Sequence, residues 1–247
     1  MNILNNYDLA ILAGGLGKRL APVTKGRQKV LASVGAKPFL EILIDYIAAQ
    51  GGQRFILCTG HGAEEVEQYF QAKKGVEIIF SREEQPLGTG GALKRAAALV
   101  GSAQFLAMNG DCFCVIDYNA LIKAHTRQSA QATIAVTRVD DAREYGTIEV
   151  GADHQIKAFK EKSACAQLLS HSTAVDRRPL INTGTYCLDR NVFDLVSTAE
   201  KFSIEYDFFP HLVGKNFYAF EVANKFIDIG TPERYAWAQQ HLKGLAK

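Results

Sequence analysis

The sequence predicts an α/β fold with a mixed, mostly parallel central sheet flanked by helices. In the first half, short apolar runs alternate with longer segments of helical period, which is the pattern of βαβ units. In the second half, several short strand-like runs follow one another across turns, and two of them form a predicted β-hairpin. Because the 247 residues contain no internal repeat and no linker-like segment, we expect a single domain over residues 1–247.

The strands of the first half are predicted from short apolar, β-branched or aromatic runs bounded by glycine or polar residues. They cover residues 9–12, 54–59, 77–80, 104–108 and 133–139. Apolar side chains at helical spacing predict three helices between them. These helices cover residues 38–50, 63–70 and 91–100.

The second half is predicted to be richer in short strands and turns. Its strands cover residues 146–150, 155–159, 183–188 and 217–222. We expect a short helix at 192–196 and a C-terminal helix at 232–242, where Thr231 is the N-cap and Pro232 fits the first turn. Residues 163–178 have little periodicity and many small or polar side chains, so we expect a loop there.

The composition is ordinary for a soluble globular protein and excludes several function classes. Hydrophobic residues make up 47% of the chain, charged residues 22%, and the net charge of +2 gives no support to a nucleic-acid or membrane surface. The five cysteines are scattered, and Cys112 and Cys114 are too close together for the usual zinc spacing. With no signal-peptide pattern and no apolar run of about twenty residues, we expect a cytoplasmic protein with reduced thiols.

A glycine-rich, cationic loop follows the first predicted strand. Three glycines end the apolar run, and five Lys or Arg side chains lie in residues 15–29. Backbone N–H groups left uncovered by glycine, together with cationic side chains, suit a polyphosphate. A Walker A loop is excluded because Leu12 and Arg19 stand at two of its required positions, and Leu20 replaces the third glycine of the dinucleotide fingerprint. The alternative is an ordinary βα turn with solvated cations.

Two carboxylates stand where strands are predicted to end. Asp111 follows the apolar run 105–108, and Asp228 lies shortly before the C-terminal helix. Open α/β sheets bind ligands at the carboxyl ends of their strands, and paired carboxylates suit Mg²⁺. Each aspartate alone is typical of a turn, but together with the glycine loop they predict a metal site beside a phosphate ligand.

A series of motifs carries a family resemblance over about residues 8–240. In order, they are Gly14-Gly15-x-Gly17-x-Arg19-Leu20 with Lys29, Leu87-Gly88-Thr89-Gly90-Gly91-Ala92, Asn109-Gly110-Asp111, Tyr145-Gly146, Phe159-x-Glu161-Lys162, Asn182-Thr183-Gly184-x-Tyr186 and Asp228-Ile229-Gly230-Thr231-Pro232. The set resembles the sugar-1-phosphate nucleotidylyltransferases, above all the guanylyltransferases that make GDP-heptose or GDP-mannose. The resemblance implies one Rossmann-like nucleotide-binding domain, with its nucleotide-binding half at about 8–140 and its sugar-binding half and C-terminal helix at about 141–247.

The resemblance also implies a reaction, which is Mg²⁺-dependent transfer of a nucleotidyl group from a nucleoside triphosphate to a sugar 1-phosphate. It implies catalytic roles for Arg19, Lys29, Asp111 and Asp228, with both aspartates as metal ligands. The residues expected to bind the nucleotide are Leu12, Ala13, Gly14, Gly15, Gly17, Lys18, Glu84, Gln85, Gly88, Thr89 and Gly110. Those expected to bind the sugar phosphate are Gly146, Glu161, Lys162, Asn182 and Thr183.

The segment before Gly88 is expected to meet the nucleobase. One carboxylate, such as that of Glu84, accepts both donors of the guanine pairing edge, whereas the single donor of thymine or uracil suits Gln85 better. The alternative is that the glutamates of this segment face solvent. Because the segment resembles the guanylyltransferases, our first assignment is a GTP-dependent D-glycero-D-manno-heptose 1-phosphate guanylyltransferase of lipopolysaccharide or surface-polysaccharide biosynthesis.

Three other functions stay open from the sequence. The first is guanylyl transfer to mannose 1-phosphate, and the second is thymidylyl, uridylyl or cytidylyl transfer to another sugar 1-phosphate. The third is a nucleotide-sugar-sensing regulatory protein, which loss of a catalytic residue would favour, although all four are present. The expected partners are small-molecule substrates, neither nucleic acid nor membrane, with a homo-oligomer as an open alternative.

Overall fold

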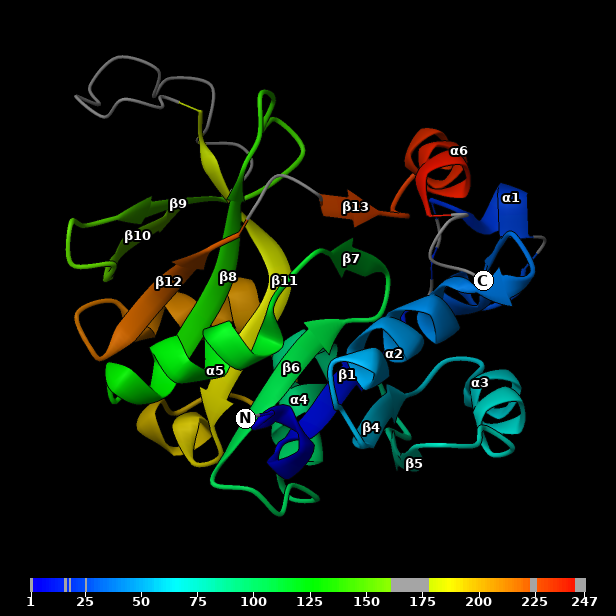
Figure 1. The fold of residues 1–247 in the computed structure, drawn as a ribbon, viewed down its shortest axis with the longest axis horizontal. Helices are drawn as coiled ribbons and strands as arrows, with labels where there is room; N and C mark the ends of the chain where they lie inside the picture. Colours follow the sequence, from blue (N-terminus) through cyan, green and yellow to red (C-terminus); the bar gives the residue numbers. More distant parts are fainter. Residues whose placement is uncertain are drawn as a thin grey trace.

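The computed structural model describes residues 2–15, 17, 19–24, 26–160, 178–222 and 226–242. Its main sheet has nine strands, in the order β10-β9-β11-β6-β1-β4-β5, with β8 beside β11 and β12 beside β8 (Figure 1). These strands are β1 (Asp8–Leu12), β4 (Arg54–Thr59), β5 (Glu77–Arg82), β6 (Gln104–Asn109), β8 (Ala132–Arg138), β9 (Thr147–Val150), β10 (Ile156–Lys160), β11 (Leu180–Asp189) and β12 (Phe217–Glu221).

The remaining elements are helices and two short two-stranded sheets. The α-helices are α1 (Ala21–Thr24), α2 (Phe39–Ala49), α3 (Ala63–Phe70), α4 (Gly88–Ala97), α5 (Tyr118–Arg127) and α6 (Pro232–His241). The short 3₁₀-helices are η1 (Leu4–Asn6), η2 (Lys29–Leu31), η4 (Val192–Leu195) and η6 (Phe209–Leu212). One short π-helix is η5 (Ile204–Phe208). The small sheets pair β2 (Ser33–Val34) with β3 (Lys37–Pro38), and β7 (Cys112–Cys114) with β13 (Phe226–Asp228).

The main sheet is mixed, as the sequence predicts. Its strands run parallel through β6, β1, β4 and β5, which are the strands joined by helical crossovers. Strand β11 pairs antiparallel with β6, β8 and β9, and the β9–β10 hairpin extends that side of the sheet. The glycine-rich motifs of the first half and the second-half motifs that are predicted to bind the sugar are therefore carried by one sheet.

The core has two parts because alternate side chains of the central strands point to opposite faces. Leu9 and Ile11 of β1 pack with α2 and α5 on one face, in front of the sheet in Figure 1. Ala10 packs with α4 on the other face, where the aromatic side chains of η5 and η6 also lie. Continuous apolar strands such as β1 are typical of a sheet covered on both faces. Within the described part of the chain, no helix combines the length and apolar character needed to span a bilayer.

Most predicted elements are confirmed with small changes at their ends. The strand at 54–59 and the helix at 63–70 match to the residue, and Thr231 caps α6 by accepting the Arg234 N–H. The helix expected from residue 91 begins at Gly88 instead, so the glycine motif forms its first turn. Residues 163–177 of the predicted loop lie outside the described part.

The sequence analysis missed helix α5. Asp117 caps this helix by accepting the N–H of Ala120 at 3.0 Å, and a buried face includes Tyr118, Leu121 and His125. Because a histidine and a tyrosine take core positions, the apolar pattern is weaker than the burial pattern. No range was predicted for the three-residue strands β7 and β13, and their pairing, which was not predicted, has the larger consequence for function.

We predict that Asp8 contributes stability in a pH-dependent way. Its buried carboxylate pairs with Arg54 and accepts the N–H groups of Gly101 at 2.7 Å and Ser102 at 3.1 Å. Burial raises the pKa of Asp8, but these partners outweigh burial and hold the pKa below its ordinary value of 3.8. Asp8→Asn should lower the free energy of unfolding by about 1–3 kcal/mol at pH 7, measured by urea denaturation.

The depressed pKa of Asp8 determines how its contribution to stability changes with pH. Since the folded-state pKa is depressed, the contribution is complete above the unfolded pKa and is lost as the pH falls through the folded pKa. The difference between wild type and Asp8→Asn should therefore shrink below about pH 4. Asp141→Asn is the control, because exposed Asp141 pairs with exposed Arg143 and solvent screens that pair. A difference that persists unchanged into acid would contradict the prediction.

Candidate active site

The glycine loop begins where β1 ends and closes against Lys29. Ala13 donates its N–H to the Cys58 carbonyl at 2.9 Å, which extends the β1–β4 ladder by one residue. Gly17 has a positive φ of +54°, and a Cβ there would stand 2.9 Å from the Cβ of Lys29. Only glycine combines this backbone conformation with such a close neighbour. The loop geometry thus fixes the position of Lys29 beside the end of the strand.

The four residues predicted to be catalytic line one pocket of about 170 Å³. They are Arg19, Lys29, Asp111 and Asp228. Two residues predicted to bind the sugar phosphate, Gly146 and Asn182, line the same pocket. The structure therefore brings together residues from the glycine loop, the end of β6, β13 and the part of the sheet that is predicted to bind the sugar.

The pairing of β7 with β13 joins the two carboxylates. Asp228 lies opposite Cys112 in this antiparallel pair, and Ile229 donates its N–H to the carbonyl of Asp111 at 3.0 Å. The Asp111 carboxylate forms an ion pair with the Lys29 ammonium group. Both aspartates thus lie at one end of a short ribbon, with a cation of the glycine segment beside them.

The Asp228 carboxylate is buried and fully hydrogen-bonded. Nη1 of Arg234 lies 3.0 Å from Oδ1 and 2.9 Å from Oδ2. The N–H of Gly230 donates to Oδ1 at 2.8 Å, and the hydroxyl of Tyr145 donates to Oδ2 at 2.8 Å. Burial disfavours the charged guanidinium, but the bond to Asp228 outweighs burial and raises the pKa of Arg234.

Two neutral groups beside the carboxylates respond to their charge. Burial, and then the charge of Asp228, raises the pKa of Tyr145, so this phenol stays protonated and can donate. Burial, followed by the charges of Asp111 and Asp228, raises the pKa of the Cys112 thiol well above its ordinary value. Both carboxylates therefore lie close to the Cys112 thiol.

On the side of the pocket that is predicted to bind the sugar, Asn182 belongs to a polar network. Its Nδ2 donates to the Tyr186 hydroxyl and to Oε1 of Glu205, each at 2.9 Å. Glu205 lies on the π-helix η5 and lines the pocket as well. Thr183, also predicted to bind the sugar phosphate, is not among the residues that line the pocket, and its buried hydroxyl donates to the Ala135 carbonyl at 2.8 Å.

The segment expected to meet the base lies outside this pocket. Glu84 and Gln85 are exposed, and Thr89 Oγ1 accepts the N–H of Ile204 at 3.0 Å. Gly88 has a positive φ of +72°, and a Cβ there would lie 2.5 Å from the carbonyl oxygen of Phe202. The structure thus gives Gly88 a packing reason, independent of any contact with a base.

The other predicted nucleotide residues lie along the glycine loop and the start of β7. Gly110 donates its N–H to the Leu12 carbonyl at 2.9 Å, which ties β1 to the turn before Asp111. Gly14 lies against the backbone of Gly60, and Gly15 is exposed with open space around it. Three predicted site residues, Lys18, Glu161 and Lys162, lie outside the described residues.

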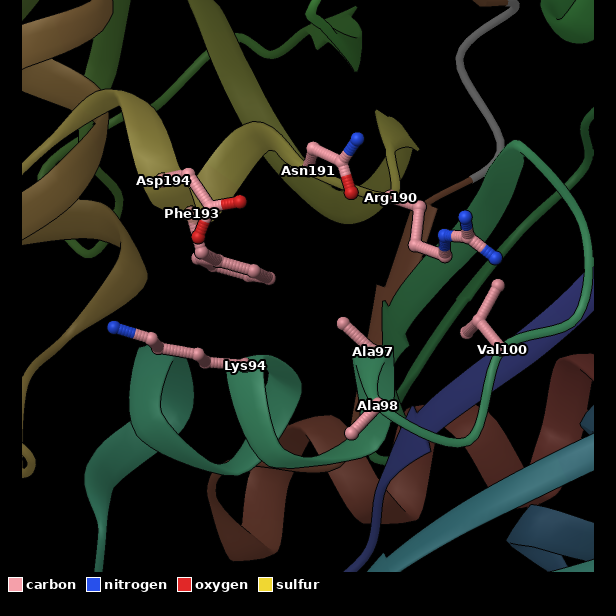
Figure 2. Close-up of a pocket in the computed structure, with 8 residues that line it drawn as sticks. All are labelled: Lys94, Ala97, Ala98, Val100, Arg190, Asn191, Phe193 and Asp194. Atoms are coloured by element: carbon pink, nitrogen blue, oxygen red, sulfur yellow. The ribbon is translucent and has the colours of Figure 1, made fainter.

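A second hollow of about 330 Å³ lies between α4 and the turn after β11 (Figure 2). Lys94, Arg190, Phe193 and Asp194 are among the residues that line it. It is larger than the carboxylate pocket, yet it contains none of the predicted site residues. Cations near the C-terminal end of a helix offset the helix dipole without any ligand. We therefore assign the chemistry to the smaller pocket.

A metal ion is compatible with the carboxylate pocket. Among the described residues, no three His, Cys, Asp or Glu side chains are grouped as metal ligands. Mg²⁺ needs only one or two protein carboxylates, because substrate phosphates and water supply its other ligands. Asp111 and Asp228 supply this pair of hard oxygen donors on one short ribbon.

Several residues that line the pocket were given no role from the sequence. Among them are Tyr145, Glu205 and Arg234. Tyr145 stands in a quoted motif, but only its neighbour Gly146 was assigned a role. Arg234 carried a detectable signal, since a cation in the first turn of a helix is unfavourable beside the positive end of the dipole.

Comparisons with known proteins were made for the whole chain. The sequence model of the family described as nucleotidyl transferase matches residues 9–244. The chain is 37% identical over 238 residues to a D-glycero-alpha-D-manno-heptose 1-phosphate guanylyltransferase of Aneurinibacillus thermoaerophilus, covering 96% of this chain and 98% of that relative. It is 31% identical to a mannose-1-phosphate guanylyltransferase of Mycobacterium tuberculosis, covering 98% of this chain and 66% of that relative. The crystal structure of HddC from Yersinia pseudotuberculosis complexed with GMP-PN is similar with a TM-score of 0.79 and 34% identity, over 96% of this chain and 100% of that one.

We predict that Gly88→Ala destabilises the protein through the Phe202 contact. A left-handed conformation costs a non-glycine residue about 1–2 kcal/mol, and the Cβ would also press on the Phe202 carbonyl. Gly75→Ala is the matched control, because Gly75 has a similar φ of +85° and open space around it. Urea denaturation should give a larger loss for Gly88→Ala than for Gly75→Ala. Equal losses would mean that the Phe202 carbonyl imposes no constraint.

Proposed function

The chain belongs to the nucleotidyl transferase family, and we propose that it transfers a guanylyl group from GTP to D-glycero-D-manno-heptose 1-phosphate. The products are then GDP-heptose and pyrophosphate. The observation that carries this proposal is the 37% identity, over nearly the full length of both chains, to a relative with that named activity. The pocket lined by Arg19, Lys29, Asp111 and Asp228 is the site where we expect the reaction.

The proposed chemistry needs positioning and charge neutralisation more than covalent help from the protein. A phosphate oxygen of the sugar 1-phosphate attacks the α-phosphorus of GTP, a P–O bond forms, and the bond to pyrophosphate breaks on the opposite side. Arg19 and Lys29 provide positive charge for the departing pyrophosphate. Among the described residues that line the pocket, the titratable side chains are carboxylates, cations, tyrosines and a thiol, with no histidine.

We propose Mg²⁺ as the metal and Asp111 and Asp228 as its protein ligands. The family generally uses a divalent metal ion. When bound, such an ion neutralises charge on the phosphate oxygens and orients them. On the protein side, Tyr145 and Gly230 hold the Asp228 carboxylate in place by donating one hydrogen bond to each of its oxygens.

Among the glutamates before Gly88, we propose that Glu83 reads the guanine base. Glu83 is half-buried, whereas Glu84 is exposed. Its Oε2 accepts the Leu87 N–H at 3.1 Å, and its carboxylate lies over Gly60, which borders Gly14 of the glycine loop. A carboxylate held beside the phosphate loop can accept both N1–H and the N2 amine of guanine.

The proposed location is the cytoplasm, where nucleoside triphosphates are available. Support comes from the cysteines, since the described ones, Cys58, Cys112, Cys114 and Cys187, are all free thiols. Free thiols are ordinary in a reducing compartment.

The proposed function is tested by pyrophosphate release. Purified protein with Mg²⁺ is incubated with ATP, GTP, CTP, UTP or dTTP, each with heptose 1-phosphate or mannose 1-phosphate. We expect release only with GTP, and a higher kcat/KM with heptose 1-phosphate than with mannose 1-phosphate. A preference for mannose 1-phosphate would reassign the sugar, and release with UTP or dTTP instead of GTP would overturn the base assignment.

The same assay includes Asp111→Asn as the active-site control. This variant removes the charge that pairs with Lys29 but keeps the size of the side chain. We expect turnover to be abolished, while the circular dichroism spectrum and melting temperature stay near those of the wild type. Full activity would remove Asp111 from the metal site.

We predict that Glu83→Gln weakens the use of GTP, whereas Glu84→Gln does not. Loss of the charged acceptor should lower kcat/KM for GTP by roughly 10- to 100-fold, because a hydrogen bond to a charged group contributes about 1.5–3 kcal/mol. Glutamine at this position should also improve the use of UTP and dTTP relative to GTP. A loss found in Glu84→Gln and not in Glu83→Gln would transfer base recognition to Glu84.

A further inference from the structure

Nothing can be added to the Asp228 carboxylate without removing one of its present partners. A carboxylate accepts hydrogen bonds at about four positions, two on each oxygen. Nη1 of Arg234 takes one position on each oxygen, because it lies 3.0 Å from Oδ1 and 2.9 Å from Oδ2. Gly230 takes another position on Oδ1 and Tyr145 another on Oδ2. Any cation that reaches this carboxylate must therefore displace one of these three groups.

Arg234 is the partner best suited to leave. The Gly230 N–H is part of a buried backbone turn that begins at Asp228 itself. Tyr145 is neutral, so its loss would leave the charge balance unsolved. An incoming cation replaces the charge of Arg234, whereas it cannot replace the fixed geometry of a backbone donor.

The position of Arg234 in its helix supports this reading. Arg234 lies in the first turn of α6, and a cation there opposes the positive end of the helix dipole. The helix itself therefore does not favour a guanidinium group at this place. The interaction of Arg234 with Asp228 explains why a guanidinium group stands there. A residue that is unfavourable for its own helix in this way is typical of a functional site.

A guanidinium released from Asp228 would still have partners in the pocket. Its Cζ lies 4.8 Å from the ring centroid of Tyr145, in a cation–π arrangement. Its Nη2 lies 3.6 Å from Oε2 of Glu144, a carboxylate at the pocket rim. The side chain can thus leave Asp228 by a small rotation and remain charged and paired.

We propose that Arg234 and the divalent cation compete for the Asp228 carboxylate. Arg234 holds this carboxylate until the metal arrives, and the metal then takes its place while the guanidinium moves toward Glu144. This inference rests on the proposed use of a divalent metal at Asp228. It makes Arg234 a positioning residue that lowers the affinity of the free site for metal, because part of the binding energy goes into breaking the Arg234–Asp228 contact.

The test is direct Mn²⁺ binding to the full-length protein without nucleotide, measured from the electron paramagnetic resonance signal of free Mn²⁺. Arg234→Gln should bind Mn²⁺ roughly fivefold or more tightly than the wild type, at the lower end of typical coupling between two ligands of one protein. In the double variant Arg234→Gln with Asp228→Asn the gain should disappear. Unchanged or weaker Mn²⁺ binding by Arg234→Gln would overturn the proposal.

A matched control separates local competition from overall charge. Arg143→Gln also removes one positive charge close in sequence to the pocket, but Arg143 is exposed and pairs with Asp141 instead of Asp228. We expect Arg143→Gln to bind Mn²⁺ like the wild type. The same gain in both variants would mean that net charge, and not displacement of Arg234, sets the affinity.

A second measurement follows Arg234 in the wild-type protein itself, and a variant serves only to assign the signal. In the wild-type protein labelled with ¹⁵N-arginine, Mg²⁺ should shift the Nε–Hε resonance of Arg234 and leave that of Arg143 in place. The Arg234 signal is assigned by its absence in Arg234→Lys. A bound metal with an unmoved Arg234 signal would contradict the exchange. Because both measurements use the metal alone, they can succeed or fail independently of the turnover assay that tests the proposed function.

Discussion

The short pairing between β7 and β13 is the contact on which the candidate active site depends. It places Asp228 opposite Cys112 and bonds Ile229 to the Asp111 carbonyl, although these segments lie far apart in the chain. The rest of the fold holds the two strands in reach: β7 follows directly from the central strand β6, and β13 leads directly into α6. Two carboxylates on one ribbon repel each other unless cations lie beside them, so the ribbon requires positively charged side chains close by.

The neighbouring elements meet this requirement with one cation for each carboxylate. Lys29, placed by the closing of the glycine loop, pairs with Asp111, and Arg234 from α6 pairs with Asp228. A buried carboxylate without such a partner would be costly, and removing one member of a buried pair is more harmful than replacing both. The same cations are the groups that a polyphosphate or a metal would exchange with, so the same side chains contribute to the stability of the pocket and to its proposed chemistry.

The regular elements could be predicted from the sequence because their patterns are local. The strand at 54–59 is a continuous apolar run, and the helix at 63–70 has an amphipathic pattern with a large polar face. The ribbon was not predictable in this way, since three-residue strands carry no period and their pairing is a tertiary event. The same contrast between local patterns and tertiary contacts applies to the residues of the candidate site. Motifs found Asp111 and Asp228, whereas the hydrogen bonds of Tyr145 and Arg234 to Asp228 depend on a turn of backbone that sequence spacing does not reveal.

The segment around Gly88 illustrates why a motif residue need not contact the ligand it predicts. Its positive φ and the nearby Phe202 carbonyl already require glycine, and the N–H groups of Gly90 and Gly91 also donate to that carbonyl. The start of α4 is thereby tied to the segment that leads into η5, which carries Glu205 into the pocket. The glycine motif is thus explained by the contacts that join the start of α4 to the segment before η5. The proposed recognition of the base rests instead on the residues just before the helix, where Glu83 is anchored by the Leu87 N–H and borders the glycine loop through Gly60.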